Sequence, residues 1–169
     1  KRLVRARQCI RELALPFVVP APSELPARLD GVLATLYLLF NEGYKASSGD
    51  RLVREELCHE AIRLALQLVG HPATRQPRTH ALLALMFFNA ARLPACVSET
   101  GNLLRLHEQD RSIWNQAMIQ EGVQQLVLAG TGETLSVYHL EAGIAACHST
   151  ATPLPQPTGH ASSHFTMLS

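Results

Sequence analysis

Cysteine and histidine are the residues of this sequence best suited to chemistry, since their side chains bind metals and serve as nucleophiles or proton carriers. The chain contains four cysteines and eight histidines. Cys58 and His59 are neighbours, and so are Cys147 and His148. Neighbouring side chains on a helix point about 100° apart, so neither pair is suited to hold one ion. With no Cys-x-x-Cys pair either, we expect no metal site and no cofactor.

Motifs for covalent catalysis do not occur in the sequence. It contains no Gly-x-Ser-x-Gly turn and no glycine-rich phosphate loop. The four cysteines are scattered, which is typical of reduced thiols that pack as small apolar side chains in a cytosolic protein. We therefore expect a binding protein rather than an enzyme.

Polar and aromatic residues at expected helix ends are the candidates for an interaction site: Asn41, Glu42 and Tyr44 at the end of one helix, and Gln109, Asp110, Arg111 and Trp114 at the start of another. A purely structural role is the alternative, because Asp110 suits a helix N-cap and Trp114 suits a core. Glu42 lies near the negative end of its helix, so we expect it to have a cationic or hydrogen-donating partner.

Helices must position these residues, and the spacing of apolar residues predicts six of them, over about residues 1–13, 25–43, 51–69, 79–93, 110–130 and 135–148. Residues 81–88 are apolar on all sides, which predicts a central helix. In the fifth helix we expect core-facing side chains at Ile113, Trp114, Ala117, Val123, Leu126 and Val127. The pattern favours an all-α fold of stacked antiparallel helical hairpins over residues 27–150, similar to tetratricopeptide (TPR) repeats or an α-α superhelix.

Positive charge is concentrated at the start of the chain. Residues 1–13 contain five basic residues and one acidic residue, which give a net charge of +4, although the whole chain has a net charge of +1. Prolines at positions 16, 20, 22 and 26 predict a linker over residues 16–26. The sequence begins with lysine, so we expect it to be part of a longer protein.

Composition indicates a cytoplasmic domain with a covered surface. Hydrophobic residues make up 47% of the chain and charged residues only 17%, which favours a surface that a partner covers. The apolar runs are too short to span a bilayer, and no secretory signal opens the sequence, so we expect no membrane association.

Several strings of residues point to one family when they are taken together: Leu36-Tyr-Leu-Leu-Phe-Asn-Glu-Gly-Tyr44, Gly49-Asp-Arg-Leu-Val-Arg54, Glu60-Ala-Ile-Arg-Leu64, Leu82-Leu-Ala-Leu-Met86, Gln109-Asp-Arg111 with Trp114, and Ala145-Ala-Cys-His148. Over roughly residues 1–150, the chain resembles the C-terminal part of bacterial extracytoplasmic-function (ECF) RNA polymerase sigma factors that have a long TPR-like extension. Asn89-Ala-Ala-Arg92 departs from the His-Asp-Ala-Arg that is usual in this family.

The resemblance implies that residues 1–15 are the end of the promoter-reading helix of sigma region 4, with Arg2, Arg5 and Arg7 as a remnant of the DNA contact. Promoter DNA then binds only through sigma regions outside this sequence, because a lone helix end lacks the scaffold that orients it. The partners implied are sigma regions 2 and 4 of the parent protein, RNA polymerase, or a regulatory protein.

Residues 151–169 depart from the family and are predicted to be disordered, with a reading-frame shift after His148 as the hypothesis for their origin. Reading Gln156 to Ser169 from the third base of each codon permits Thr-Asp-Trp-Pro-Arg-Ile-Val-Ala-Phe-Tyr-Asp-Ala-Leu, which resembles the final helix of the family. The loss of that helix would expose apolar surface on the preceding helix and favour a homodimer.

The sequence therefore predicts a regulatory domain of a sigma factor, which acts in transcription initiation through protein contacts. Two rival functions remain. One is a free-standing helical scaffold unrelated to transcription. The other is a small-molecule sensor with a pocket lined by Trp114, Tyr44 and Phe88.

Overall fold

The computed structural model describes residues 2–13, 18–45, 53–98 and 100–151 of the chain. Every regular element in these ranges is helical, apart from one isolated antiparallel bridge between Val97 and Leu103. The all-α fold predicted from the sequence is thus confirmed. No helix among these residues is both long enough and apolar enough to cross a bilayer.

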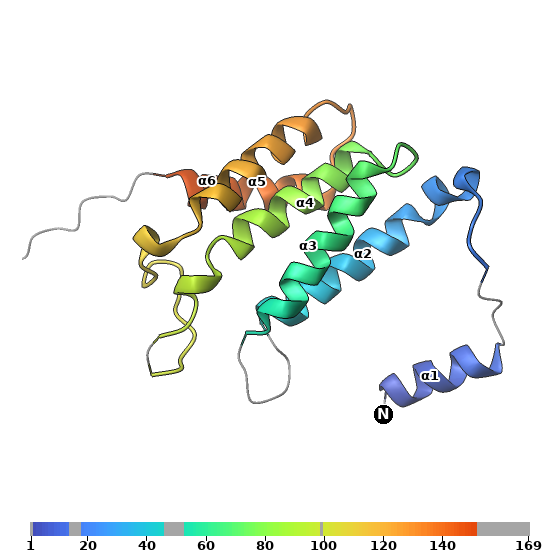
Figure 1. The fold of residues 1–169 in the computed structure, drawn as a ribbon, viewed down its shortest axis with the longest axis horizontal. Helices are drawn as coiled ribbons and strands as arrows, with labels where there is room; N and C mark the ends of the chain where they lie inside the picture. The colour runs from blue at the N-terminus through green and yellow to red at the C-terminus, as the bar shows by residue number, and fades with distance from the viewer. Residues whose placement is uncertain (1, 14–17, 46–52, 99, 152–169) are drawn as a thin grey trace, which may run out of the picture.

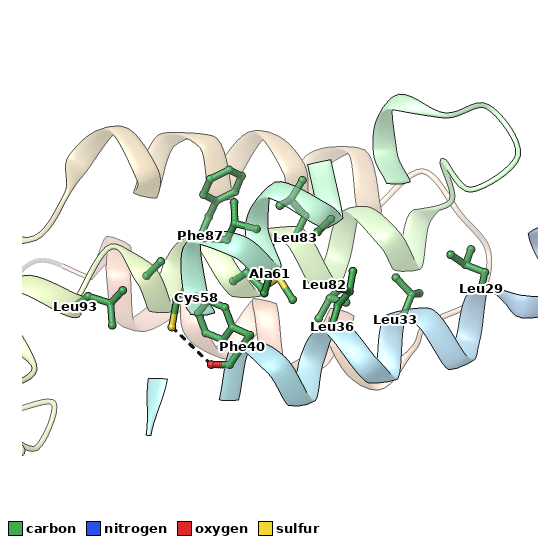
Figure 2. Close-up of a cluster of buried hydrophobic side chains, with 14 residues drawn as sticks. Leu29, Leu33, Leu36, Phe40, Cys58, Ala61, Leu82, Leu83, Phe87 and Leu93 are labelled. Atoms are coloured by element: carbon green, nitrogen blue, oxygen red, sulfur yellow. Dashed lines mark hydrogen bonds between the residues drawn. The ribbon is translucent and has the colours of Figure 1, made fainter. Parts of the chain in front are cut away.

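The first hairpin consists of α2 (Leu25–Tyr44) and α3 (Glu55–Gly70). Apolar residues three and four positions apart give α2 one buried face, made of Leu29, Leu33, Leu36 and Phe40. This face packs against Cys58, Ala61, Ile62 and Ala65 of α3, as Figure 2 shows for Cys58 and Ala61. The small residues of α3 let the two helices approach closely.

The second hairpin consists of α4 (Pro77–Ala90) and α5 (Gln116–Ala129). All eight residues from 81 to 88 are buried, which confirms the central position predicted for this helix. Leu82, Leu83, Met86 and Phe87 pack toward the first hairpin, whereas Ala84, Leu85 and Phe88 pack toward α5 and the last helix. Figure 1 shows α4 running through the middle of the bundle.

The last described helix, α6 (Val137–Thr150), packs mainly against α4 and also contacts α5. Its inner face includes Ala142 and Ala145, which join the same cluster as Phe88 and Trp114. On the side of the first hairpin, the Tyr37 hydroxyl of α2 donates a hydrogen bond to Glu141 at 3.0 Å. The bundle is thus two hairpins followed by a single helix.

Helix α1 (Arg2–Glu12) lies apart from this bundle (Figure 1). Its described side chains are all exposed, including Val4 at 67% and Ile10 at 60%. The sequence predicts the position of this helix correctly, but its described apolar side chains bury nothing within the described part of the chain.

Several boundaries differ from the sequence predictions by a few residues. The bundle begins at Leu25 rather than at residue 27, and the predicted linker contains a 3-10 turn, η1 (Pro22–Glu24). Helix α3 begins at Glu55, so Val53 and Arg54 are not helical. The predicted fourth helix is broken after Ala90, and a second 3-10 turn, η2 (Leu93–Ala95), follows because Pro94 cannot extend an α-helix.

The predicted core face of the fifth helix is only partly correct. Trp114 is buried and Leu126 packs against the same cluster, but Ile113, Val123 and Val127 are 50%, 40% and 68% exposed and Ala117 is exposed. The buried residues of α5 are instead Ile119, Gly122 and Ala129. The reason is close packing, since a Cβ at Gly122 would lie 2.9 Å from a ring carbon of Phe88. A contact this tight selects small residues, which a search for large apolar side chains does not find.

Candidate interaction surface

Tyr44, at the end of α2, connects the two groups of candidate residues. It is half-buried, and its ring stacks on Phe40 with centroids 6.1 Å apart. The Tyr44 hydroxyl accepts a hydrogen bond from the Cys96 thiol at 3.6 Å, and the Arg92 guanidinium lies 5.8 Å from the ring centroid. Burial raises the pKa of the Tyr44 phenol well above its usual value, although Arg92 opposes the shift, so the hydroxyl stays protonated at neutral pH.

Gln109 reaches the same thiol from the other direction. Its Nε2 donates to the Cys96 sulfur at 3.8 Å and to the Leu104 carbonyl at 3.1 Å. Tyr44 and Gln109 therefore meet through Cys96, although 65 residues separate them in the sequence. We call Tyr44, Arg92, Cys96 and Gln109 the Tyr44 cluster.

Arg92 and Cys96 were missed as site residues by the sequence analysis. Arg92 also contacts the Asn89 side chain, whose own amide donates to the Leu85 carbonyl at 3.1 Å. The Arg92 Nε and the Gln109 Oε1 are buried and have no hydrogen-bond partner among the described residues. The only sequence signal for these two missed residues was the polar pair Asn89 and Arg92 after a long apolar run.

The other residues near Tyr44 have simpler surroundings. Asn41 is exposed, and Glu42 is half-buried. Gly43 is buried because the first turn of α3 packs against it. A Cβ at this position would lie 2.8 Å from the Arg54 carbonyl oxygen and from the Cys58 sulfur. Close packing thus accounts for Gly43, while Asn41 is exposed three residues before Tyr44 on the same helix.

Asp110 caps a different element from the one predicted. Its Oδ1 accepts hydrogen bonds from the Ser112 backbone at 2.8 Å and the Ser112 hydroxyl at 2.7 Å. These bonds hold the pKa of Asp110 below its usual value. They begin a 3-10 turn, η3 (Arg111–Ile113), and Asn115 is the residue that caps α5, by accepting from the Met118 backbone at 3.1 Å.

Trp114 is buried at 4% exposure, in agreement with the core role considered for it. The Arg111 guanidinium lies 5.0 Å from its ring centroid and donates to the Ala151 carbonyl at 2.8 Å, so it binds the end of α6. A hollow of about 480 Å³ adjoins this corner and is lined by Arg111, Ser112, Trp114, Gln116, Ser149, Thr150 and Ala151. Phe88 is fully buried in the same core cluster as Trp114, and Tyr44 packs against the other core cluster, so neither lines the hollow and the lining differs from the predicted pocket.

The basic residues of α1 lie away from the Tyr44 cluster. Arg5 and Arg7 are exposed, and the helix begins at Arg2. The positive charges of Arg5, Arg7 and Arg11 therefore face solvent on this helix.

The cysteines fall into two classes. Cys58 and Cys96 are buried, as interpreted from the sequence, whereas Cys9 and Cys147 are exposed, so the buried role was wrong for these two. Burial raises the pKa of Cys58 to about 12, which keeps it as a thiol that donates weakly to the Phe40 carbonyl. Within the described ranges, no three His, Cys, Asp or Glu side chains gather as metal ligands would.

Comparison with known proteins gives a family without a known activity. The family of unknown function DUF6596 matches residues 28–130, which is more than half of the chain. An uncharacterised protein of Rhizobium meliloti (strain 1021) is 34% identical over 152 residues, which cover 89% of this chain and 36% of the relative. The chain thus spans little more than a third of that relative's length. No solved structure gives a significant match.

Proposed function

We propose, for a chain that belongs to the DUF6596 family of unknown function, that it is a regulatory protein-interaction domain of a bacterial ECF RNA polymerase sigma factor. In this proposal the helical bundle acts in transcription initiation. It binds sigma regions 2 and 4 of the parent protein, or the polymerase, and thereby modulates the activity of the factor.

The observation that carries this proposal is α1. An isolated helix of 11 residues is marginal in water, because forming the first turn is costly. The exposed Val4 and Ile10 side chains would stabilise α1 only if another protein surface covered them. A basic helix whose apolar side chains need a cover fits the end of a sigma region 4 domain, which the family resemblance implies for residues 1–15.

Three further features support a contact with a partner at the Tyr44 end of the bundle. Arg92 and Gln109 each have a buried polar atom with no hydrogen-bond partner among the described residues, and such atoms are costly unless a hydrogen bond satisfies them. Asn41 is exposed three residues before Tyr44 on α2. The greater length of the Rhizobium relative is also consistent with a domain that works within a larger protein.

The test is a binding measurement between the 169-residue chain and purified sigma regions 2 and 4 of the parent protein. We expect saturable binding that Asn41→Ala weakens roughly tenfold, which corresponds to the loss of about 1.4 kcal/mol. Gln124→Ala is the matched control, since Gln124 is also an exposed amide on a helix but lies on α5. Absence of binding, or equal effects of both variants, would contradict the proposal.

A small-molecule sensor is the second candidate, and the hollow beside Trp114 is the observation that favours it. Its volume of about 480 Å³ lies in the usual range for ligand sites, and the buried Trp114 Nε1 has no hydrogen-bond acceptor among the described residues. Trp114 is the only tryptophan, so its fluorescence would respond to an occupant. A metabolite screen that changes neither this fluorescence nor the melting temperature would exclude this candidate.

A further inference from the structure

Helix α6 has an uncovered apolar stripe on the side opposite the core. Val137, Leu140 and Ile144 are 57%, 60% and 61% exposed, and Cys147 is exposed one turn further on. These positions follow the three-and-four spacing of one helix face. Nonpolar side chains in such a row normally lie against another element rather than against water.

The architecture of the bundle indicates what kind of element is missing there. Helix α2 packs along α3, and α4 packs along α5, so each forms a hairpin with the next helix. Among the described residues, α6 has no following helix to pair with. A helical stack needs a polar outer face at its ends to remain soluble alone, and α6 does not have one.

The sequence after α6 is poorly suited to supply the missing helix. Pro153, Pro155, Pro157 and Gly159 follow within ten residues of Thr150, and proline cannot continue a helix.

We propose that a second copy of this chain covers the stripe, with two α6 helices packed antiparallel about a two-fold axis. The spacing of the stripe is the reason. Positions 137, 140, 144 and 147 are symmetric about position 142, so an antiparallel copy sets Leu140 against Ile144 and Val137 against Cys147. Every apolar residue of the stripe then meets an apolar residue.

Charge and shape agree with this pairing. The only carboxylate of α6 belongs to Glu141, which is bonded to Tyr37 on the inner side, so no acidic side chain opposes its copy. Gly143 lies next to the symmetry point, and a Cβ there would meet nothing within 4 Å. The absence of a side chain lets the two helix backbones approach closely.

Sedimentation velocity of the full chain under reducing conditions tests the pairing. The interface is small, so we expect a monomer at about 5 µM that shifts toward a dimer by about 500 µM. Ile144→Glu should weaken the dimer at least tenfold, because the axis brings each new charge into the apolar contact. Leu66→Glu, on the exposed side of α3, is the control and should leave the dimer unchanged.

Disulfide trapping tests the direction of the helices, in a Cys9→Ser background that removes the other exposed thiol. In the antiparallel register, two Cys147 residues lie about 15 Å apart along the axis, too far for a disulfide. Val137→Cys should therefore give an oxidised dimer through Cys147 of the other copy, and further replacement of Cys147 by alanine should abolish it.

Two outcomes would overturn the proposal. Crosslinking through Cys147 without Val137→Cys would indicate parallel helices. A chain that stays monomeric at all concentrations would exclude the second copy. If Ile144→Glu also lowered the melting temperature of that monomer, residues 152–169 would be identified as the cover instead.

Discussion

His139 is the histidine whose surroundings define its role most fully. It is buried, its Nδ1 accepts a hydrogen bond from the Ser136 backbone at 2.9 Å, and its Nε2 lies 3.2 Å from the Ala129 carbonyl. A carbonyl oxygen only accepts, so the Nε2 must carry the proton. The neutral imidazole of His139 therefore connects the end of α5 to the start of α6 through these two hydrogen bonds.

We predict that His139→Ala destabilises the protein by about 1–3 kcal/mol, since it leaves a buried carbonyl and a backbone N–H without their partner. Urea unfolding followed by circular dichroism measures this change. His148→Ala is the control, because His148 is exposed on the same helix and its loss should have little effect. Equal stabilities for the two variants would show that the bridge contributes nothing.

Two glycines of α2 give a matched pair. A Cβ at Gly43 would lie 2.8 Å from atoms of Arg54 and Cys58, whereas a Cβ at Gly31 would meet nothing within 4 Å. Gly43→Ala should therefore cost about 1–3 kcal/mol through overpacking. Gly31→Ala should stabilise by about 0.5–1 kcal/mol, because alanine favours the helix. Thermal and urea unfolding should show opposite signs, and a neutral or stabilising Gly43→Ala would contradict the packing of α2 on α3.

At the scale of single elements, the turn η3 depends on Asp110. The pKa of Asp110 is lowered by its bonds to Ser112, so its ionised form is stabilised in the folded state. A lowered pKa contributes stability that is present above the unfolded pKa and is lost as the pH falls through the folded value. Asp110→Ala should therefore lower the melting temperature at pH 7, and the difference from the unsubstituted chain should shrink below about pH 3.9.

Differential scanning fluorimetry across this pH range measures the difference. Asp110→Asn keeps a capping side chain without the charge, and it should recover part of the loss at pH 7. Normal stability of Asp110→Ala together with lost binding to the sigma regions would instead assign Asp110 to the interaction surface.

The helices themselves were predictable, because apolar spacing identifies α2 and α4 and glycine or proline marks their ends. The face of α5 was not, because it packs through Gly122 and Ala129, and small residues do not stand out in a hydrophobic pattern. The cap of α5 was assigned to Asp110 rather than Asn115 for a related reason. Both residues are good caps, and the sequence does not reveal a 3-10 turn between them.

At the scale of the whole molecule, the sequence predicted which residues to examine but not how they assemble. Tyr44 and Gln109 were both candidates, yet their link through Cys96 depends on the packing of α2 beside η2. Contacts between residues this far apart in the sequence cannot be predicted from the local spacing of apolar and polar residues. The exposed stripe of α6 likewise became evident only when the inner face of that helix was known.

Helices α1 and α6 have a common property. Helix α1, which lies apart from the bundle, exposes apolar side chains, and α6 exposes an apolar stripe on the outside of the bundle. Both features are unusual for a protein that works alone, and they agree with a domain that is covered by partners. The proposal assigns sigma regions to α1 and the Tyr44 cluster, and a second copy to the stripe of α6.

The nucleotide sequence of the gene on the 5′ side of the Lys1 codon tests the central proposal most directly. The proposal predicts sigma regions 2 and 4 in the same reading frame, with α1 as the end of the region 4 helix. An unrelated domain in that frame, or a start codon directly before Lys1, would contradict it.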